Sequence, residues 1–199
     1  MNTENLLHFI KTADYENFKK DFFSQNLSEI EKQKILVLII DESYEHNKFA
    51  FYKVVLDCII DRRLNLNFYI ENSDAKSLLE LVILRAPYVE LFDYFITNGA
   101  KINFYQIPKN KVNNYAEFDE IETCLDFANK HISDMSYDLE TYSEYKEDYS
   151  TVTQKKVSID RLVYKDLLEQ SKHLHDLKRT SELKDFILAS GGKKYKDLK

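Results

Sequence analysis

The stretch "FDYFITNGAKINF" (92–104) decides the fold, because an apolar run at helical spacing ends in it at a glycine. The chain has 199 residues, of which three are glycine and two are proline. Gly99 follows this run, and Gly191 and Gly192 follow a second one in "FILASGGKK" (186–194). A helix that stops and turns often ends in a left-handed residue, a conformation that glycine adopts without steric cost. We therefore predict that Gly99, and Gly191 or Gly192, end helices.

The rest of the chain shows the same helical pattern. Apolar residues recur at three- and four-residue spacing nearly throughout, which predicts an all-α protein with no continuous sheet. Asp14 is a candidate N-cap, and Ser28 and Ser77 each begin a capping box with a glutamate three residues later. Pro87 lies between two helical patterns, where it ends one helix or begins the next.

The helical units are also self-similar. "LNLNF" (64–68) and "AKINF" (100–104) lie 36 residues apart, and each follows a helix and precedes further helical pattern. A period of this length with two short helices in each unit is typical of a helical repeat array.

One unit carries a family resemblance. Residues 77–103, "SLLELVILRAPYVELFDYFITNGAKIN", resemble an ankyrin repeat. Ser77 stands where that family has a threonine cap, Leu79 where it has a core leucine, and the pair Gly99 and Ala100 where a repeat closes. The resemblance implies paired antiparallel helices that stack into one array and bind other proteins.

Two further segments are similar to parts of the same motif. "TCLDFA" (123–128) keeps the Thr, Leu and Ala of the opening motif, with Cys124 where proline is usual, and "ASGGKK" (189–194) is similar to a closing motif. The motif proline is missing everywhere, and Arg63 lies where a glycine is expected. A helical repeat of another type therefore remains the alternative.

The resemblance implies about four degenerate repeats in a single domain, with a long helical hairpin inserted in the last of them. The tyrosines of the insertion either pack between its two helices or form a recognition surface. The expected segments are a capping helix pair at 1–27, repeats at 28–68 and 69–104, a long loop at 105–122, and a terminal repeat at 123–198 with its helical insertion at about 132–179.

Motifs for chemistry are missing from the sequence. There is no glycine-rich phosphate loop, no Gly-x-Ser-x-Gly, and no Cys or His pair at zinc spacing. Glu169 and His173 lie one helical turn apart, but no second half of a metal site accompanies them, so we interpret them as a surface pair. Cys58 and Cys124 are expected to be buried free thiols. We predict no catalytic, cofactor or metal residues and a non-enzymatic protein-protein interaction module; an enzyme with an unrecognised site is the less favoured alternative.

Charge narrows the class of partner. The formal net charge of −6 argues against nucleic acid, which requires a basic surface. Residues 117–148 hold 11 acidic residues against two lysines, a local net charge of −9 that favours a basic protein partner through electrostatic steering. Small acidic repeat proteins resemble immunity or antitoxin proteins, so neutralisation of a basic toxin such as a nuclease is an alternative function.

No apolar window approaches the length of a membrane helix, and the first residues lack the features of a secretory signal. We therefore expect a cytoplasmic protein without a membrane partner, and the sequence does not indicate its oligomeric state. The expected contact region is the turn after Phe68 together with the long loop after Phe104, which offers aromatic anchors. The candidate partner-binding residues are Tyr69, Asp74, Tyr105, Asn113, Asn114, Tyr115, Glu117, Phe118, Asp119 and Glu120.

Overall fold

A computed structural model describes residues 3–60, 64–71, 73–105, 122–137 and 159–198. This described part contains eight α-helices and no strand, which confirms the prediction of an all-α protein. The helices are α1 (Thr3–Lys11), α2 (Tyr15–Ser24), α3 (Glu29–Leu38), α4 (Phe49–Ile59), α5 (Leu78–Arg85), α6 (Val89–Thr97), an unlabelled helix at residues 124–137, and α8 (Ile159–Ala189).

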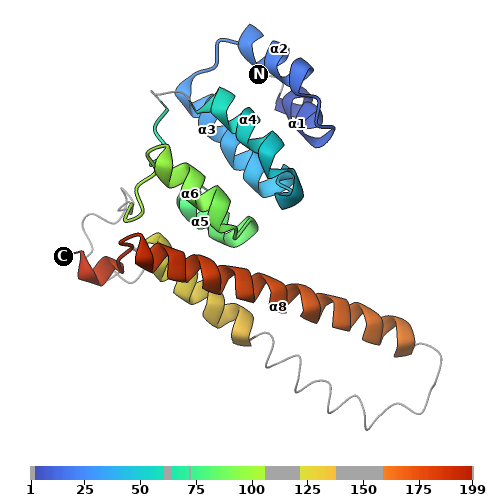
Figure 1. The fold of residues 1–199 in the computed structure, drawn as a ribbon, viewed down its shortest axis with the longest axis vertical. Coiled ribbons are helices and arrows are strands. Elements are labelled where there is room, and N and C mark those ends of the chain that lie inside the picture. The colour runs from blue at the N-terminus through green and yellow to red at the C-terminus, as the bar shows by residue number, and fades with distance from the viewer. Residues whose placement is uncertain (1–2, 61–63, 72, 106–121, 138–158, 199) are drawn as a thin grey trace.

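The helices form pairs that stack in chain order, α1 with α2, α3 with α4, α5 with α6, and helix 124–137 with α8 (Figure 1). The second helices lie side by side, since α4 contacts α2 and α8 contacts α6. On the other side, a π-helical turn after α3, η1 (Ile39–Ser43), contacts both α1 and α5. The stack therefore has a layer of first helices and a layer of second helices.

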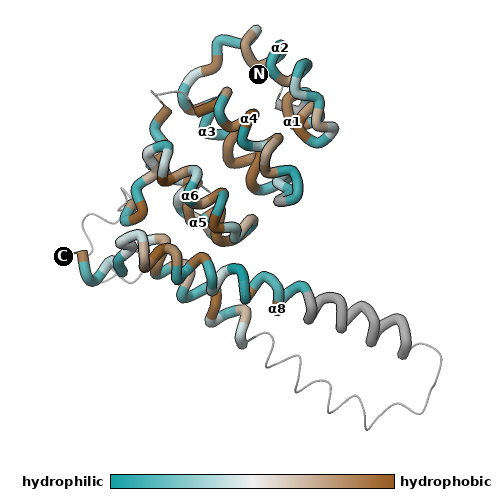
Figure 2. Tube along the Cα trace, viewed as in Figure 1, coloured by the Kyte–Doolittle hydropathy of each residue, from teal (hydrophilic) through white to brown (hydrophobic). Residues whose placement is uncertain are grey.

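The core runs through this stack rather than forming one centre. Figure 2 shows apolar stretches in α4, α5 and α6, in the middle of the stack, while the described part of α8 away from its C-terminal end is largely hydrophilic. No described helix is both long enough and apolar enough to span a membrane. The largest side chains that are fully buried are Tyr52, Phe18, Phe92, Phe95, Leu6, Ile10, Ile35, Leu36, Ile39, Leu56, Ile59 and Leu78.

The three predicted helix starts are confirmed. The Asp14 carboxylate accepts a hydrogen bond from the backbone N–H three residues on, at 3.2 Å, and α2 begins at the next residue. Ser28 and Glu31 form a complete capping box at the start of α3, and Ser77 and Glu80 form another at the start of α5. These local contacts satisfy backbone N–H groups that a helix leaves without intrahelical partners.

Gly99 ends α6 in the predicted left-handed conformation, with φ of 104°. Its N–H donates to the Ile96 carbonyl at 3.0 Å, and the N–H of Ala100 donates to the Phe95 carbonyl at 2.9 Å. This pair of bonds is the Schellman motif, which satisfies the last carbonyls of a helix. Gly191, with φ of 85°, ends α8 in the same way, so it is the first glycine of its pair that stops the helix.

Replacement of Gly99 by valine is expected to lower the free energy of unfolding by roughly 1 kcal/mol or more, because a β-branched side chain is unfavourable in the left-handed region. The space is open, since no atom lies within 4 Å of the position that a Cβ would take, so the cost arises from the backbone. Gly99→Asn, the control, should cost less, because asparagine tolerates this conformation. Urea denaturation measures both; equal midpoints for wild type and Gly99→Val would contradict the helix-stop role.

A third helix ends in the same way without a glycine. Ala13, after α1, has φ of 55°, and its N–H donates to the Ile10 carbonyl at 3.1 Å. The N–H of Asp14 completes the motif at the Phe9 carbonyl, at 2.7 Å. Because alanine gives no sign of this conformation in a sequence, the turn was not predicted from it.

Two asparagines connect successive helix pairs through the same contact. In each case Nδ2 donates to the carbonyl of a helix-ending glycine, and Oδ1 accepts from the backbone N–H two residues after that glycine. Asn67 makes this contact with Gly99, at 3.1 Å and 2.6 Å, and Asn103 makes it with Gly191, at 3.2 Å and 2.7 Å. Asn67 and Asn103 occupy matching places in the two similar segments 64–68 and 100–104.

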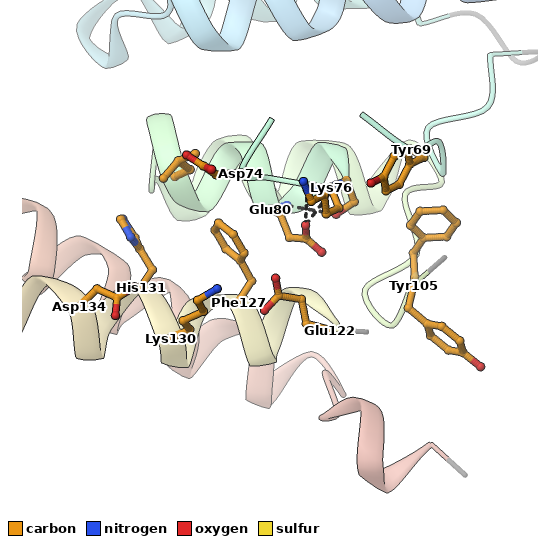
Figure 3. Close-up of a pocket in the computed structure, with 13 residues that line it drawn as sticks. Tyr69, Asp74, Lys76, Glu80, Tyr105, Glu122, Phe127, Lys130, His131 and Asp134 are labelled. Carbon is orange, nitrogen blue, oxygen red and sulfur yellow. Dashed lines mark hydrogen bonds between the residues drawn. The ribbon is translucent and has the colours of Figure 1, made fainter. Parts of the chain in front are cut away.

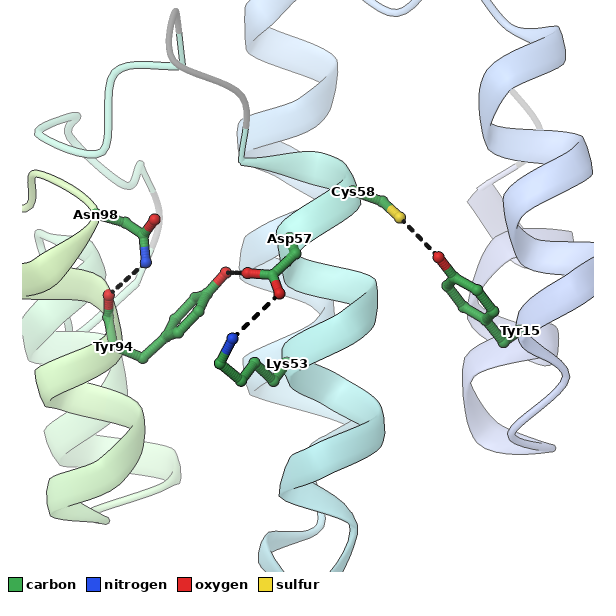
Figure 4. Close-up of polar contacts among 6 residues, drawn as sticks. All are labelled: Tyr15, Lys53, Asp57, Cys58, Tyr94 and Asn98. Carbon is green, nitrogen blue, oxygen red and sulfur yellow. Dashed lines mark hydrogen bonds and ion pairs between the residues drawn. The ribbon is translucent and has the colours of Figure 1, made fainter.

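Tyrosines connect the second helices to one another (Figure 4). Tyr94 of α6 donates to the Asp57 carboxylate of α4 at 2.7 Å, and Lys53 pairs with the same carboxylate at 3.2 Å. On the other side of α4, the hydroxyl of Tyr15 lies 3.2 Å from the Cys58 sulfur. Both cysteines are free thiols; Cys124 is buried, as predicted, whereas Cys58 is only partly buried.

Helix α8 is continuous from 159 to 189. It includes residues that the sequence assigned to the inserted hairpin and residues assigned to the last helix of the terminal unit. The first helix expected in the insertion, with its tyrosines at 142, 145 and 149, lies outside the described residues.

Candidate functional site

A pocket of about 730 Å³ lies on the first-helix side of the stack, between α5 and helix 124–137 (Figure 3). The segments before α5 and after Asn103 border it as well. Its lining combines carboxylates, basic groups and aromatic rings: Tyr69, Asp74, Lys76, Ser77, Glu80, Leu84, Phe104, Tyr105, Glu122, Phe127, Lys130, His131 and Asp134.

The pocket brings together every predicted contact residue that the structure describes. Tyr69 and Asp74 come from the segment before α5, and Tyr105 follows the helix pair α5 and α6 of the 69–104 unit. In Figure 3 the Tyr69 ring points toward the pocket, whereas the Tyr105 ring turns away from it. The other candidates lie outside the described residues: Asn113, Asn114, Tyr115, Glu117, Phe118, Asp119 and Glu120.

Glu80 is held by the start of α5. Its Oε2 accepts the backbone N–H of Lys76 at 2.5 Å and that of Ser77 at 3.2 Å, and its side chain and backbone together are only 1% exposed. Within the described part of the chain, no hydrogen-bond donor contacts Oε1. The helix start therefore satisfies one oxygen of this buried carboxylate and leaves the other facing the pocket.

The opposite wall is fixed at the start of helix 124–137. Asp126 accepts the backbone N–H of Thr123 at 3.1 Å and that of Tyr195 at 2.7 Å, so it joins this helix to the chain after α8. The Thr123 hydroxyl donates to the Lys193 carbonyl at 2.7 Å. Because Glu122 directly precedes this network, its backbone is anchored next to the pocket.

Two carboxylates face each other across the pocket, those of Glu80 and Glu122 (Figure 3). The pKa of Glu80 is raised from 4.5 to about 7, chiefly by burial and also by the charge of Glu122, against the lowering effect of hydrogen bonds from Lys76 and Ser77. Burial also raises the pKa of Glu122, which Lys130 partly offsets. Both shifts have the same main origin, since burial destabilises the charged form of a carboxylate.

The basic groups of the lining do not neutralise these acids directly. The ammonium group of Lys76 donates to the Ser73 carbonyl, and in the described residues neither Lys76 nor Lys130 forms an ion pair with Glu80 or Glu122. Burial lowers the pKa of His131, which favours its neutral form near pH 7. The pocket thus has four carboxylates and two ammonium groups in its lining.

Aromatic rings supply the apolar part of the lining. The ring of Phe127 is buried and stacks against His131, with centroids 6.2 Å apart. Tyr105 packs edge-on against Tyr195, at 4.8 Å between centroids, and remains 39% exposed at the rim. The rim therefore carries a partly exposed tyrosine, a residue type that is enriched at protein-binding surfaces.

Metal chemistry finds no support in the described residues. No group of three or more His, Cys, Asp and Glu side chains there is placed to hold an ion. His173 lies with His131, Asp134 and Asp176 around a smaller pocket of about 270 Å³, while nothing is described of the Glu169 side chain.

Sequence reasoning missed three residues that define the pocket: Glu80, Glu122 and Phe127. Glu80 was recognised only as part of a capping box. Its place inside the apolar run "LLELVIL" (78–84) could have indicated a buried carboxylate, because every other residue of the run is apolar.

The described residues define a class of protein: a stack of helix pairs with an acidic, partly aromatic pocket on one side. No known protein family matches the chain, and no curated protein or solved structure is significantly similar to it.

Proposed function

We propose that this chain is a non-enzymatic protein-binding module of the ankyrin-repeat type. Three features of the described residues support the repeat assignment. The helix pairs stack in chain order, the ends of α6 and α8 turn at left-handed glycines, and Asn67 and Asn103 make the same contact with the next unit. Matching contacts at matching sequence positions are expected of a repeat array, in which each unit packs on its neighbours.

The observation that carries the binding function is the pocket itself. Tyr69 and Asp74 lie 36 and 31 residues before Tyr105 in the sequence, yet all three line one cavity. It lies on the first-helix side of the stack, next to the turns that a repeat array uses for recognition. A concave, mixed polar and aromatic surface suits an anchor side chain from a partner.

Charge supports a basic partner. The lining has an excess of carboxylates, and residues 117–148 carry a local net charge of −9. Neutralisation of a basic toxin, in the manner of an immunity protein, is the specific form of this function that such acidity favours. Inhibition of a basic nuclease encoded in the same genome would support that form.

The binding function is tested by site-specific photo-cross-linking. A photoreactive phenylalanine analogue placed at Tyr105, at the rim of the pocket, is expected to cross-link a discrete partner in a lysate of the native cell. The control places it at Phe23, which is 62% exposed on α2, far along the stack from the pocket. Mass spectrometry identifies the products. Cross-links of equal yield and identity at both positions, or none at Tyr105, would contradict binding at this pocket.

With the partner in hand, kinetics test the role of charge. We expect Asp74→Asn, and the triple replacement of Glu117, Asp119 and Glu120 by Gln, to slow association, since exposed charges act mainly on the on-rate. The effect of these variants on the association rate should shrink at high salt. The screening length is about 8 Å at physiological ionic strength and becomes shorter as salt is added. Asp93→Asn, an exposed change on α6, is the control. Association that is insensitive both to salt and to these variants would exclude electrostatic steering by this face.

A further inference from the structure

The pocket contains a buried carboxylate oxygen with no described donor, Oε1 of Glu80. The residue is 1% exposed, and its other oxygen is already occupied by two backbone N–H groups. Buried polar atoms are nearly always hydrogen-bonded, and a buried charge is normally paired. Oε1 is therefore the acceptor that this carboxylate offers to an occupant of the pocket.

A cation that donates hydrogen bonds suits the space between two carboxylates best, because it supplies both the donors and the opposite charge. Glu122 faces Glu80 across the pocket, so both carboxylates act on whatever lies between them (Figure 3). A bare metal ion is a poor occupant, because the described residues contain no group of three ligating side chains. An organic cation fits better, since it brings several N–H donors and needs no complete coordination shell.

The lysines of the pocket do not fill this role in the described residues. Lys76 turns its ammonium group to the Ser73 carbonyl, and Lys130, which is exposed, forms no ion pair with Glu80 or Glu122. Within the described residues, neither lysine of the lining supplies the cation.

Resting on the proposed binding function, we propose that the pocket binds the guanidinium group of an arginine side chain presented by a protein partner, with Glu80 Oε1 and Glu122 as acceptors. A guanidinium has five donors in a planar fork, which suits two facing carboxylates, and it stacks on aromatic rings. Phe104 and Phe127 in the lining offer such rings. Lysine offers a compact ammonium group without a plane to stack, so the pocket favours arginine.

The direct test uses three blocked tripeptides, acetyl-Ala-Arg-Ala-amide and its citrulline and lysine counterparts. Citrulline has nearly the shape of arginine without its charge. Each is titrated up to 10 mM into the full chain labelled with ¹⁵N, and amide chemical shifts are followed at Ser77, Glu80 and Phe127. We expect saturable shifts for the arginine peptide, binding at least fivefold weaker for lysine, and no saturation for citrulline.

Two variants assign the acceptors. Glu80→Gln keeps the capping box, because glutamine can take the same position, and should weaken arginine-peptide binding at least tenfold. Glu122→Gln lies outside that box and should weaken it several-fold. Glu90→Gln, an exposed change on α6, is the matched control and should leave binding unchanged. Circular dichroism of each variant confirms that it is folded.

The outcomes separate this inference from the proposed function. Equal binding of arginine and citrulline peptides, no saturable binding of the arginine peptide, or unchanged binding by both Glu80→Gln and Glu122→Gln would overturn the arginine pocket. Tighter binding of the lysine peptide would show that the pocket prefers an ammonium group to a guanidinium group, and would also overturn the arginine pocket. A partner that still cross-links at Tyr105 in those cases leaves the binding function standing. Specific arginine-peptide binding without any cross-linked protein would instead support the pocket and contradict the function.

Discussion

Phe92→Ala is expected to lower the free energy of unfolding by about 3–5 kcal/mol, the range observed when a fully buried phenylalanine is truncated. Phe92 lies on α6 with no exposed surface, and its ring meets that of Phe186 on α8 edge-on, with centroids 6.3 Å apart. The ring therefore joins two helix pairs. Its loss leaves a cavity at the junction as well as removing buried apolar surface.

Urea denaturation followed by circular dichroism measures this effect. Phe92→Leu keeps most of the volume and should cost much less. Phe23→Ala, on the exposed part of α2, should change the free energy of unfolding by no more than about 0.5 kcal/mol. A loss at Phe92 as small as that at Phe23 would mean that α6 and α8 do not pack as described.

The elements that could be predicted from the sequence depend on contacts within a few residues of one another. Asp14, Ser28 and Ser77 cap helices through the residue three positions on, and Gly99 ends one through its own conformation. Such features carry a local sequence signature. Ala13 adopts the same helix-ending turn, but alanine is not a residue that signals it, so this turn could not be predicted from the residue type.

Contacts between helix pairs were beyond prediction for a different reason. The segments containing Asn67 and Asn103 were recognised as similar, yet the contact of Asn103 with Gly191 joins residues 88 apart. Which glycine each amide reaches depends on how the pairs stack. The bridge from Tyr94 to Asp57 likewise joins residues 37 apart on separate helices. Neither residue, considered in the sequence alone, indicates this contact.

The residues of the candidate site were predicted only in part, for the same reason. Tyr69, Asp74 and Tyr105 were chosen because they lie near turns, and the structure places all three at one pocket. Glu80 and Glu122 were not chosen, because they become important only by facing each other across the pocket. Each lies at a different helix pair (Figure 3). A single sequence shows the capping role of Glu80 but not the carboxylate opposite it.

Glu80 makes stability depend on pH, and the sign follows from its environment. Its pKa in the folded protein is raised from 4.5 to about 7, chiefly by burial. The folded state therefore holds this proton between those two values while the unfolded state has released it, so stability falls as pH rises from about 4.5 to 7. Above pH 7 the penalty is complete and amounts to about 3 kcal/mol, from 1.36 kcal/mol for each unit of the pKa rise from 4.5 to about 7.

Glu80→Gln is expected to remove this dependence. Glutamine keeps the capping box and carries no charge, so the variant should be more stable than wild type by about 3 kcal/mol at pH 8 and by much less at pH 5. Other groups near the site also titrate, among them Glu122 and His131, whose pKa shifts are in opposite directions. The difference between wild type and variant at each pH removes most of their contribution, and urea denaturation measures it. A difference that is the same at pH 5 and pH 8 would show that the Glu80 carboxylate is already compensated in the folded chain, whereas a difference confined to pH 8 identifies it as a buried charge that a bound cation would stabilise.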